Sequence, residues 1–352
     1  MSSTYSRIRS NYALDGKDYL SIKTIDMHTE GEPLRVIVDG YPELKGNTIL
    51  EKRQFAKQNL DHLRTALMFE PRGHADMYGC ILTEPEKPDS DFGIIFIHNE
   101  GYSTMCGHAT IAITKLAVEM GWVQKVEPVT TIKIDAPCGQ LVAHADISEG
   151  QVERCRFECV PSFVTALNED VVIEGYGKIK YDIAYGGAFY AYVDVSEFSI
   201  DLEPSNTQLL IDLGMKIKKA ASASASQFIK HPFEEDLSFL YGTIFIDAPV
   251  NPKHHSRNVC IFADGEVDRS PTGSGVSGRM ALHFKKKEIS LNETIPIESI
   301  LGTSFTGKVL REQKFGDINA VITEIGGSAF ITGQHNFLID PNDPLKDGFL
   351  LK

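Results

Sequence analysis

Short runs of apolar and β-branched residues dominate the chain and predict a fold with more strand than helix. These runs are bounded by Gly, Pro, Asp or Asn, as strands usually are, and they cover residues 19–27, 34–40, 91–98, 131–136, 189–195, 242–247, 258–264 and 318–325. Apolar residues recur at helical spacing in four longer segments, 51–68, 107–120, 205–219 and 273–287. The pattern therefore predicts an α/β chain.

Two of the expected helices begin alike, each after a loop that ends in a reactive side chain followed by glycine. STMCGHATIAITKL aligns with RSPTGSGVSGRMAL so that Cys106 matches Thr272 and Gly107 matches Gly273. A duplicated domain is the economical explanation of this match. We expect the ASASAS run at 221–226 to form a mobile link inside the second half.

Length and charge narrow the classes of protein to which the chain can belong. The 352 residues exceed the usual size of one domain, so two domains with one cleft between them are expected. A net charge of −13, without a basic run, argues against nucleic acid or anionic lipid as a partner. No signal-like segment or 18-residue apolar run is present, which predicts a soluble, cytoplasmic protein that does not enter the membrane.

The cysteines and glycines of the chain argue against a metal or a nucleotide cofactor. Six scattered cysteines suit a reducing compartment, and Cys155 and Cys159 are better explained as buried strand thiols than as metal ligands. Gly273, Gly275 and Gly278 spell the G-x-G-x-x-G of dinucleotide sites, but the long DGEVDRSP loop separates them from the preceding strand. We expect no metal and no cofactor.

Cys106 is the strongest candidate for chemistry. A thiol placed just before a helix meets the unpaired amides and the positive dipole end of that helix, which lower its pKa and favour the thiolate. The alternative is a buried small hydrophobic residue. Gly107, which leaves room beside the sulfur, and the polar His108 favour a functional cysteine, acting as a base or nucleophile.

The segment DRSPTGSG supplies a second half to this site. Pro271 stiffens the turn, Thr272 stands at the helix cap, and the free amides of residues 273–275 form a cradle for an anion. A substrate carboxylate held by two such amide clusters would also have a more acidic α-carbon, because the amides stabilise the charge of the enolate.

Five ordered segments, DMHTEGEPLRVI, PRGHADMYG, STMCGHATIA, DRSPTGSGVSGRMAL and GSAFITGQHNFLIDPNDPLKDGF, resemble the proline racemase family. The resemblance covers nearly the whole chain. It implies an α/β (α+β) fold of two pseudo-symmetric domains like diaminopimelate epimerase, each a mixed sheet wrapped round a central helix, and usually a homodimer. We expect the first domain at 1–181, joined by 331–352, and the second at 182–330.

The resemblance also implies roles for individual residues. Racemases of the family place a cysteine on each side of the substrate, whereas here the second position is Thr272, whose hydroxyl keeps its proton at physiological pH. A branch of the family with this Cys and Thr pairing dehydrates trans-3-hydroxy-L-proline to 1-pyrroline-2-carboxylate. Cys106 and Thr272 are then catalytic, and the imino acid is bound by Gly107, His108, Asp268, Gly273, Ser274, Tyr78 and Phe262.

Several alternatives stay open at this point. Asp268 could cap the following turn, and Tyr78 and Phe262 could be core aromatics. His28, Glu32 and His74 are more readily explained as structural residues than as catalysts. The chain could instead be a proline racemase or 4-hydroxyproline 2-epimerase, or a pseudoenzyme that binds imino acids without turnover.

Overall fold

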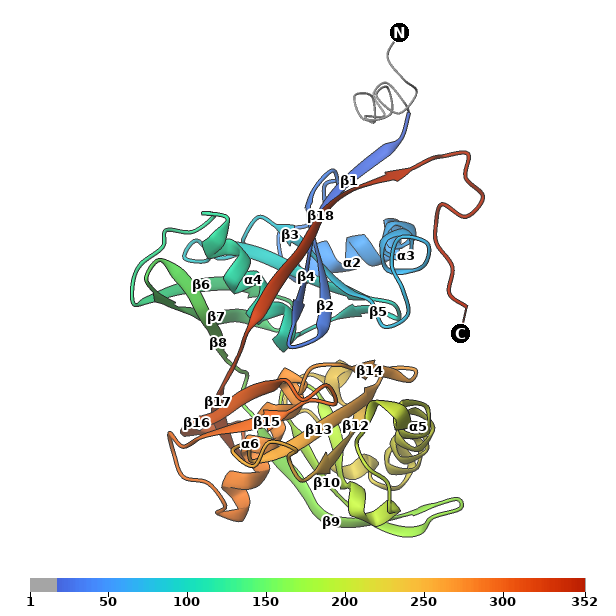
Figure 1. The fold of residues 1–352 in the computed structure, drawn as a ribbon, viewed down its shortest axis with the longest axis vertical. Helices are drawn as coiled ribbons and strands as arrows, with labels where there is room; N and C mark the ends of the chain where they lie inside the picture. Colours follow the sequence, from blue (N-terminus) through green and yellow to red (C-terminus); the bar gives the residue numbers. More distant parts are fainter. Residues whose placement is uncertain (1–17, 352) are drawn as a thin grey trace.

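The computed structural model describes residues 18–351, which fold into two α+β halves, each a mixed sheet around one central helix (Figure 1). The strands of the first half are β1 Leu20–Thr29, β2 Glu32–Asp39, β3 Tyr78–Thr83, β4 Phe92–His98, β5 Gly101–Ser103, β6 Val129–Ala136, β7 Gly139–Ser148, β8 Gln151–Glu158 and β18 Ala329–Ile339. Those of the second half are β9 Phe163–Ile173, β10 Gly177–Tyr185, β11 Phe189–Asp194, β12 Leu240–Asp247, β13 Ser256–Phe262, β14 Glu266–Asp268, β15 Thr294–Glu298, β16 Ser304–Phe315 and β17 Ile318–Gly327.

The helices are fewer than the strands, as the sequence pattern predicts. The α-helices are α2 Ile49–Asn59, α3 Asp61–Met68, α4 Gly107–Glu119, α5 Thr207–Ser224 and α6 Gly273–Lys286. Short 3-10 helices cover η1 Val195–Phe198, η2 Pro204–Asn206, η3 Ser226–Phe228 and η4 Glu235–Leu237. Among the described residues, no helix is both long and apolar enough to cross a membrane.

Strand pairing repeats from one half to the other. In the first half the order is β18, β1, β2, β3, β4, β6, β7, β8, with β5 beside β4. In the second it is β9, β10, β11, β12, β13, β15, β16, β17, with β14 beside β13. Parallel and antiparallel pairs follow in the same series, so the structure supports the duplication inferred from the two helix starts.

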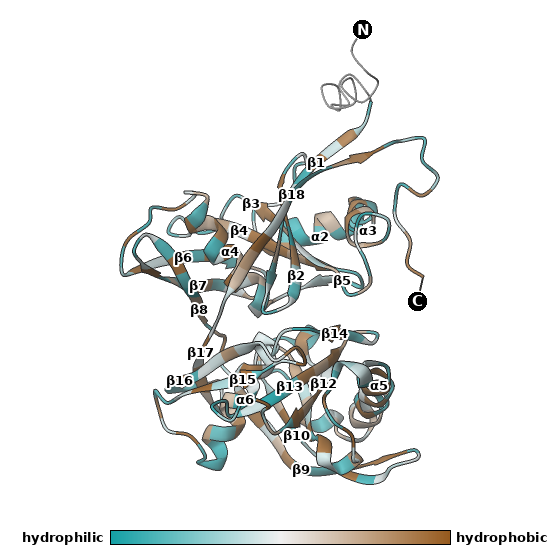
Figure 2. Ribbon diagram, viewed as in Figure 1, coloured by the Kyte–Doolittle hydropathy of each residue, from teal (hydrophilic) through white to brown (hydrophobic). Residues whose placement is uncertain are grey.

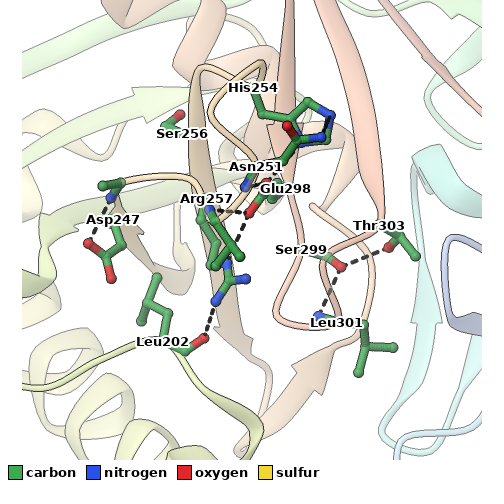
Figure 3. Close-up of polar contacts among 12 residues, drawn as sticks. Leu202, Asp247, Asn251, His254, Ser256, Arg257, Glu298, Ser299, Leu301 and Thr303 are labelled. Carbon is green, nitrogen blue, oxygen red and sulfur yellow. Dashed lines mark hydrogen bonds and ion pairs between the residues drawn. The ribbon is translucent and has the colours of Figure 1, made fainter.

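The repeat extends to single side chains. The register of the pairs makes Asp135 at the end of β6 equivalent to Glu298 at the end of β15. Asp135 accepts the backbone amides of residues 86–87 at 2.7 and 2.8 Å, and Glu298 accepts those of residues 250–251 at 2.9 and 2.7 Å. Figure 3 shows Glu298 also bonded to Arg257. Each carboxylate thus anchors the loop between equivalent strands.

The two central helices share one hydrophobic core. Both α4 and α6 are buried nearly all round, as expected for helices enclosed by a sheet. Ile111 and Leu116 of α4 belong to the same apolar cluster as Val276 and Met280 of α6. Figure 2 shows hydrophobic residues on strands such as β4 and β12 and also on α5. Burial of this shared core holds the two helix starts in fixed relation.

The expected boundary at 181/182 is wrong, because it falls inside β10, which pairs with β9 and β11. The chain leaves the first half after β8 and enters the second at β9, and β8 pairs with β17 where the halves join. The alternating residues of 151–185 form consecutive strands, so the sequence carries no break at the crossover. From the C-terminal segment, β18 pairs with β1.

The helix expected at 51–68 is divided in two. Thr48 caps α2, accepting the amide of Glu51 at 3.1 Å in a capping box. Leu60, with φ −128° and ψ 14°, separates α2 from α3. Periodicity continues across this break, which explains why the pattern predicted one helix.

The expectation of a mobile link at 221–226 is also wrong. Helix α5 continues to Ser224. Ser222 and Ser224 each bond back to a carbonyl four residues earlier, at 2.7 and 2.9 Å, and Ala221 and Ala225 are buried. Alanine is the strongest helix former, and packing against the second half outweighs the flexible composition.

Candidate active site

Cys106 and Thr272 occupy equivalent places at the start of the two central helices. Each is the residue before its helix begins, and each is 6% exposed. Cys106 has an extended backbone, whereas Thr272 has φ 68°, a backbone conformation that residues other than glycine rarely adopt. Such strain is found where a side chain must be aimed at a particular point.

The two helix starts meet at their glycines. A Cβ atom built on Gly107 would lie 2.8 Å from the Gly273 Cα, and one built on Gly273 would lie 2.8 Å from the Gly107 Cα. Only residues without a side chain permit this approach. The sequence alignment of Cys106 with Thr272 therefore corresponds to two residues that flank one point of contact between the halves.

Six backbone amides are left without helical partners at this contact. The first helical bonds run from Thr110 N to Cys106 O and from Val276 N to Thr272 O. The amides of residues 107–109 and 273–275 precede these bonds and are the usual orphan donors of a helix start. Two helix dipoles with their amides converge here, which is the arrangement that binds an anion such as a carboxylate.

The surroundings of the Cys106 thiol correct one expectation. Burial raises its pKa well above the ordinary value, and the nearby Asp268 and Glu32 carboxyls raise it further. The Ala109 amide and the Tyr78 hydroxyl act in the opposite direction. The helix start thus lowers the pKa as predicted, but desolvation is the larger effect, so the thiol is neutral in this environment.

His108 and Tyr78 lie against the thiol. Cys106 Sγ is 3.3 Å from His108 Nδ1, and the Tyr78 ring meets the His108 ring edge-on at 4.8 Å. Burial lowers the pKa of His108 to about 3, so its imidazole is neutral near pH 7. The Tyr78 hydroxyl bonds to Ser103 Oγ at 2.5 Å. Tyr78 is therefore buried in the core and also part of the site.

Asp268 adjoins the Thr272 side. Its Oδ1 accepts the amide and the hydroxyl of Ser270, at 2.8 and 2.7 Å, and Ser270 Oγ accepts the Thr272 amide at 3.2 Å. The expected capping role of Asp268 is thus present, and the carboxyl also acts on the Cys106 thiol across the site. Thr272 Oγ1 is buried and makes no close hydrogen bond among the described residues, but it is near enough to the Asp268 carboxyl and the Cys260 thiol to act on the pKa of both, in the lowering direction.

Two other predicted binding residues lie on the second half. Ser274 Oγ bonds to the Tyr190 hydroxyl at 2.8 Å, so only its backbone amide belongs to the anion cradle. Phe262, 6% exposed, packs against Tyr241 with ring centroids 5.4 Å apart. Tyr241 itself was not predicted from the sequence; burial and the neighbouring Glu266 and Cys106 raise its pKa. It lies close to both Phe262 and the thiol.

The structure also places the remaining polar residues of the motifs and two others, Glu266 and His98, that were not predicted as site residues. Glu32, 1% exposed, accepts the Arg269 amide at 2.8 Å and joins the two halves, which suits a structural residue. His28 accepts the Gly31 amide, and His74 is exposed. Glu266 and His98 approach each other across the halves at 3.8 Å. The strand that ends at His98 was predicted, but nothing in the sequence indicated that His98 would meet Glu266, because the two residues come together only in the folded chain.

The glycine fingerprint is explained by packing. A Cβ on Gly275 would lie 2.4 Å from Ile244 Cδ1, and one on Gly278 would lie 2.1 Å from the Tyr192 hydroxyl. These glycines let α6 lie close to its sheet. Over residues 18–351, no group of three or more His, Cys, Asp or Glu side chains is arranged to hold a metal ion.

Comparison with known proteins now identifies the family. The sequence model of the family described as "Proline racemase" matches residues 24–350 of this chain. The chain belongs to the proline racemase family. A relative named trans-3-hydroxy-L-proline dehydratase, from Colwellia psychrerythraea, is 55% identical over 340 residues, covering 96% of this chain and 95% of the relative. A Burkholderia multivorans relative named 3-hydroxyproline 2-epimerase is 46% identical over 332 residues, which cover 94% of this chain and 98% of that relative.

A solved structure shares the fold. It is a hydroxyproline epimerase from Agrobacterium vitis with bound trans-4-hydroxy-L-proline, 29% identical, with a TM-score of 0.84 over 94% of this chain and 96% of that one. The family membership confirms the expected fold class of two mixed α+β halves.

Proposed function

We propose that this member of the proline racemase family dehydrates trans-3-hydroxy-L-proline to 1-pyrroline-2-carboxylate, using Cys106 as the base. The observation that carries the proposal is the pairing of Cys106 with Thr272 at the two helix starts, which meet at Gly107 and Gly273. One side of the site has a thiol and the other a hydroxyl that keeps its proton. The similarity to relatives named as dehydratases supports the same reaction.

The free amides of the helix starts would bind the substrate carboxylate. Those of Gly107, His108, Gly273 and Ser274 precede the first helical bonds of the two starts, and they would also stabilise the negative charge that grows on the carboxylate as the α-proton leaves. Asp268 would bind the cationic ring nitrogen. Tyr78 on one side and Phe262 on the other would enclose the ring.

Proton removal would then follow from substrate binding. The thiol of Cys106 is neutral because it is buried beside carboxyls, and a cationic ring nitrogen would offset that negative charge and favour the thiolate. The thiolate takes the α-proton, the C–H electron pair forms the Cα–C3 double bond, and the C3–O bond breaks. The hydroxyl departs with one proton as water, and the enamine tautomerises to the imine.

Departure of the hydroxyl needs a proton donor, for which the sequence left His108 and Thr272 open. The low pKa of His108 makes it neutral near pH 7, so it would not act as an imidazolium acid. In trans-3-hydroxy-L-proline the hydroxyl lies on the same ring face as the α-proton, so the Cys106 thiol that has taken this proton would return it to the leaving oxygen and release water. Thr272, opposite Cys106, would reach the leaving oxygen only through a water molecule.

We propose in addition that the enzyme needs no cofactor, is cytoplasmic and forms a homodimer. Each step of the reaction is polar and uses only a base and hydrogen-bond donors, which supports the first point. The six cysteines are free thiols, as a reducing compartment would keep them. Size-exclusion chromatography with light scattering tests the dimer, for which the support is the family resemblance.

The reaction is tested by incubating the purified protein with trans-3-hydroxy-L-proline and trapping the imine with o-aminobenzaldehyde. We expect product from the wild type and none from Cys106→Ser, whose hydroxyl is not deprotonated near pH 7. The name of the 46% identical epimerase makes isomerisation the second candidate. If deuterium from the solvent entered the α-carbon with inversion and no imine formed, the result would favour epimerisation as the reaction of this protein. Substrate binding without either reaction would indicate a pseudoenzyme.

A further inference from the structure

Glu266 carries a buried carboxyl whose polar atoms are not satisfied by the protein. The residue is 1% exposed, and its Oε1 has no hydrogen-bond partner among the described residues. The nearest basic group to Oε2 is His98 Nδ1 at 3.8 Å, and that nitrogen already accepts the Glu100 amide at 3.2 Å. A buried carboxyl left in this state is costly unless something else supplies a hydrogen bond.

The position of Glu266 places this carboxyl at the proposed active site. Glu266 and Asp268 are two residues apart on β14 and so share one face of that strand. The loop that follows Asp268 leads through Ser270 to Thr272. On the opposite half, the His98 ring beside Glu266 stacks on Tyr78 at 5.3 Å. The carboxyl therefore lies between the Thr272 side and the Tyr78 side of the site.

The internal repeat shows that Glu266 belongs to one half only. Strand register makes Glu266 equivalent to Gly101, because Glu266 pairs with the last residue of β13 and Gly101 pairs with His98, the last of β4. A Cβ built on Gly101 would contact nothing within 4 Å. The half that carries the base Cys106 thus has no side chain at this place, and the half that carries Thr272 has a carboxyl.

We infer that Glu266 binds the ring hydroxyl of the substrate through Oε1 and thereby gives the site its preference for a 3-hydroxylated ring. This inference rests on the proposed function. A hydroxyl is a hydrogen-bond donor of the kind that the unpartnered Oε1 needs, and in trans-3-hydroxy-L-proline it lies on the same ring face as the α-proton, opposite the carboxylate. A ring without it would leave Oε1 unpaired, which is how a polar site rejects a substrate that lacks a hydroxyl.

The test compares Glu266→Ala and Glu266→Gln with the wild type. Two quantities are measured for each variant. The first is kcat/KM for trans-3-hydroxy-L-proline, and the second is the affinity for L-proline, which lacks the hydroxyl, obtained from its competitive inhibition of the reaction. Loss of a hydrogen bond to a charged group predicts a fall in kcat/KM of about 10- to 100-fold for Glu266→Ala. We expect Glu266→Ala to bind L-proline at least as tightly as the wild type does, because alanine leaves no carboxyl oxygen unpaired beside the unsubstituted ring. Glu266→Gln, which can still hydrogen-bond, should keep most of the activity.

Asp264→Ala is the matched control, because Asp264 is an exposed carboxylate in the same turn. We expect it to match the wild type in both measurements. Equal losses for the hydroxylated substrate and for L-proline would show a structural role and overturn the inference. So would unchanged kcat/KM in Glu266→Ala, or Glu266→Gln as damaged as Glu266→Ala. A wild type without dehydration would instead contradict the proposed function itself.

Discussion

Replacing Gly107 with alanine tests whether the contact between the two helix starts governs the chemistry. The new Cβ would lie 2.8 Å from Gly273 Cα and 3.2 Å from Phe157 Cζ. Carbon atoms that are not bonded to each other rest at about 3.5–4.0 Å, so the helix starts must separate by roughly 0.7 Å. The closer contact is with the backbone of Gly273, so the backbone itself has to move.

Such a displacement acts on activity more than on folding. Overpacking of a core typically lowers the free energy of unfolding by about 1–3 kcal/mol. A misplacement of about 1 Å at a reacting centre can cost on the order of 100-fold in rate. We therefore expect Gly107→Ala to fold, to lose about 1–3 kcal/mol of stability, and to show kcat/KM reduced by roughly 30- to 100-fold.

The measurements are steady-state dehydration of trans-3-hydroxy-L-proline and urea unfolding of the same preparations. Gly214→Ala is the matched control: its Cβ would lie 2.7 Å from Ile261 Cβ, a comparable overlap on α5 rather than at the helix starts. We expect the control to be destabilised to a similar extent with near-normal kcat/KM. Equal activity in the two variants would refute the reasoning, because the contact between glycines would then not position the reacting groups.

Three further predictions concern the groups around the thiol. Thr272→Cys places a second thiol opposite Cys106, so L-proline in deuterium oxide should exchange its α-proton and lose optical activity; polarimetry showing no change would contradict the proposed two-sided geometry. Tyr78→Phe removes a group that lowers the thiol pKa, so the limb of the pH profile of kcat/KM that reports the thiol should move to higher pH, and an unmoved limb would show that the hydroxyl is not involved. Because the pKa of His108 is lowered to about 3 in the fold, the unfolded chain binds the extra proton first as pH falls, and stability is lost below about pH 6.5; His108→Asn should make the free energy of unfolding between pH 6.5 and 4.5 fall less steeply by about 1.4 kcal/mol per pH unit, and an unchanged slope in urea unfolding would refute the buried neutral imidazole.

The parts of the site that depend on local chain chemistry could be predicted from the sequence. Cys106 and Thr272 precede segments whose apolar residues recur at helical spacing, and the free amides of a helix start are a property of any helix. The alignment of the two starts also indicated which residue stands opposite the thiol. The exact contact, glycine against glycine, follows only from the way the two sheets pack.

The parts that depend on tertiary packing could not be predicted. Helix chemistry alone lowers the pKa of the Cys106 thiol, but burial beside Asp268 reverses the net direction. Glu266 and His98 come from short strands in different halves and meet only in the folded chain. The boundary at 181/182 failed for a related reason, because β10 is defined by its partner strands rather than by a local signal.

The departures from internal symmetry explain why one base would suffice. Two equivalent helix starts suit a racemase, which must remove a proton on one face and return one on the other. Elimination has no such need, because the α-carbon becomes planar and no proton is returned to it by the enzyme. The second side then needs no base, and there the chain has Thr272 in the place equivalent to Cys106 and Glu266 in the place equivalent to Gly101. Restoring symmetry at Thr272 alone should therefore add proton exchange without adding dehydration, since the groups proposed to hold the hydroxyl would still differ between the halves.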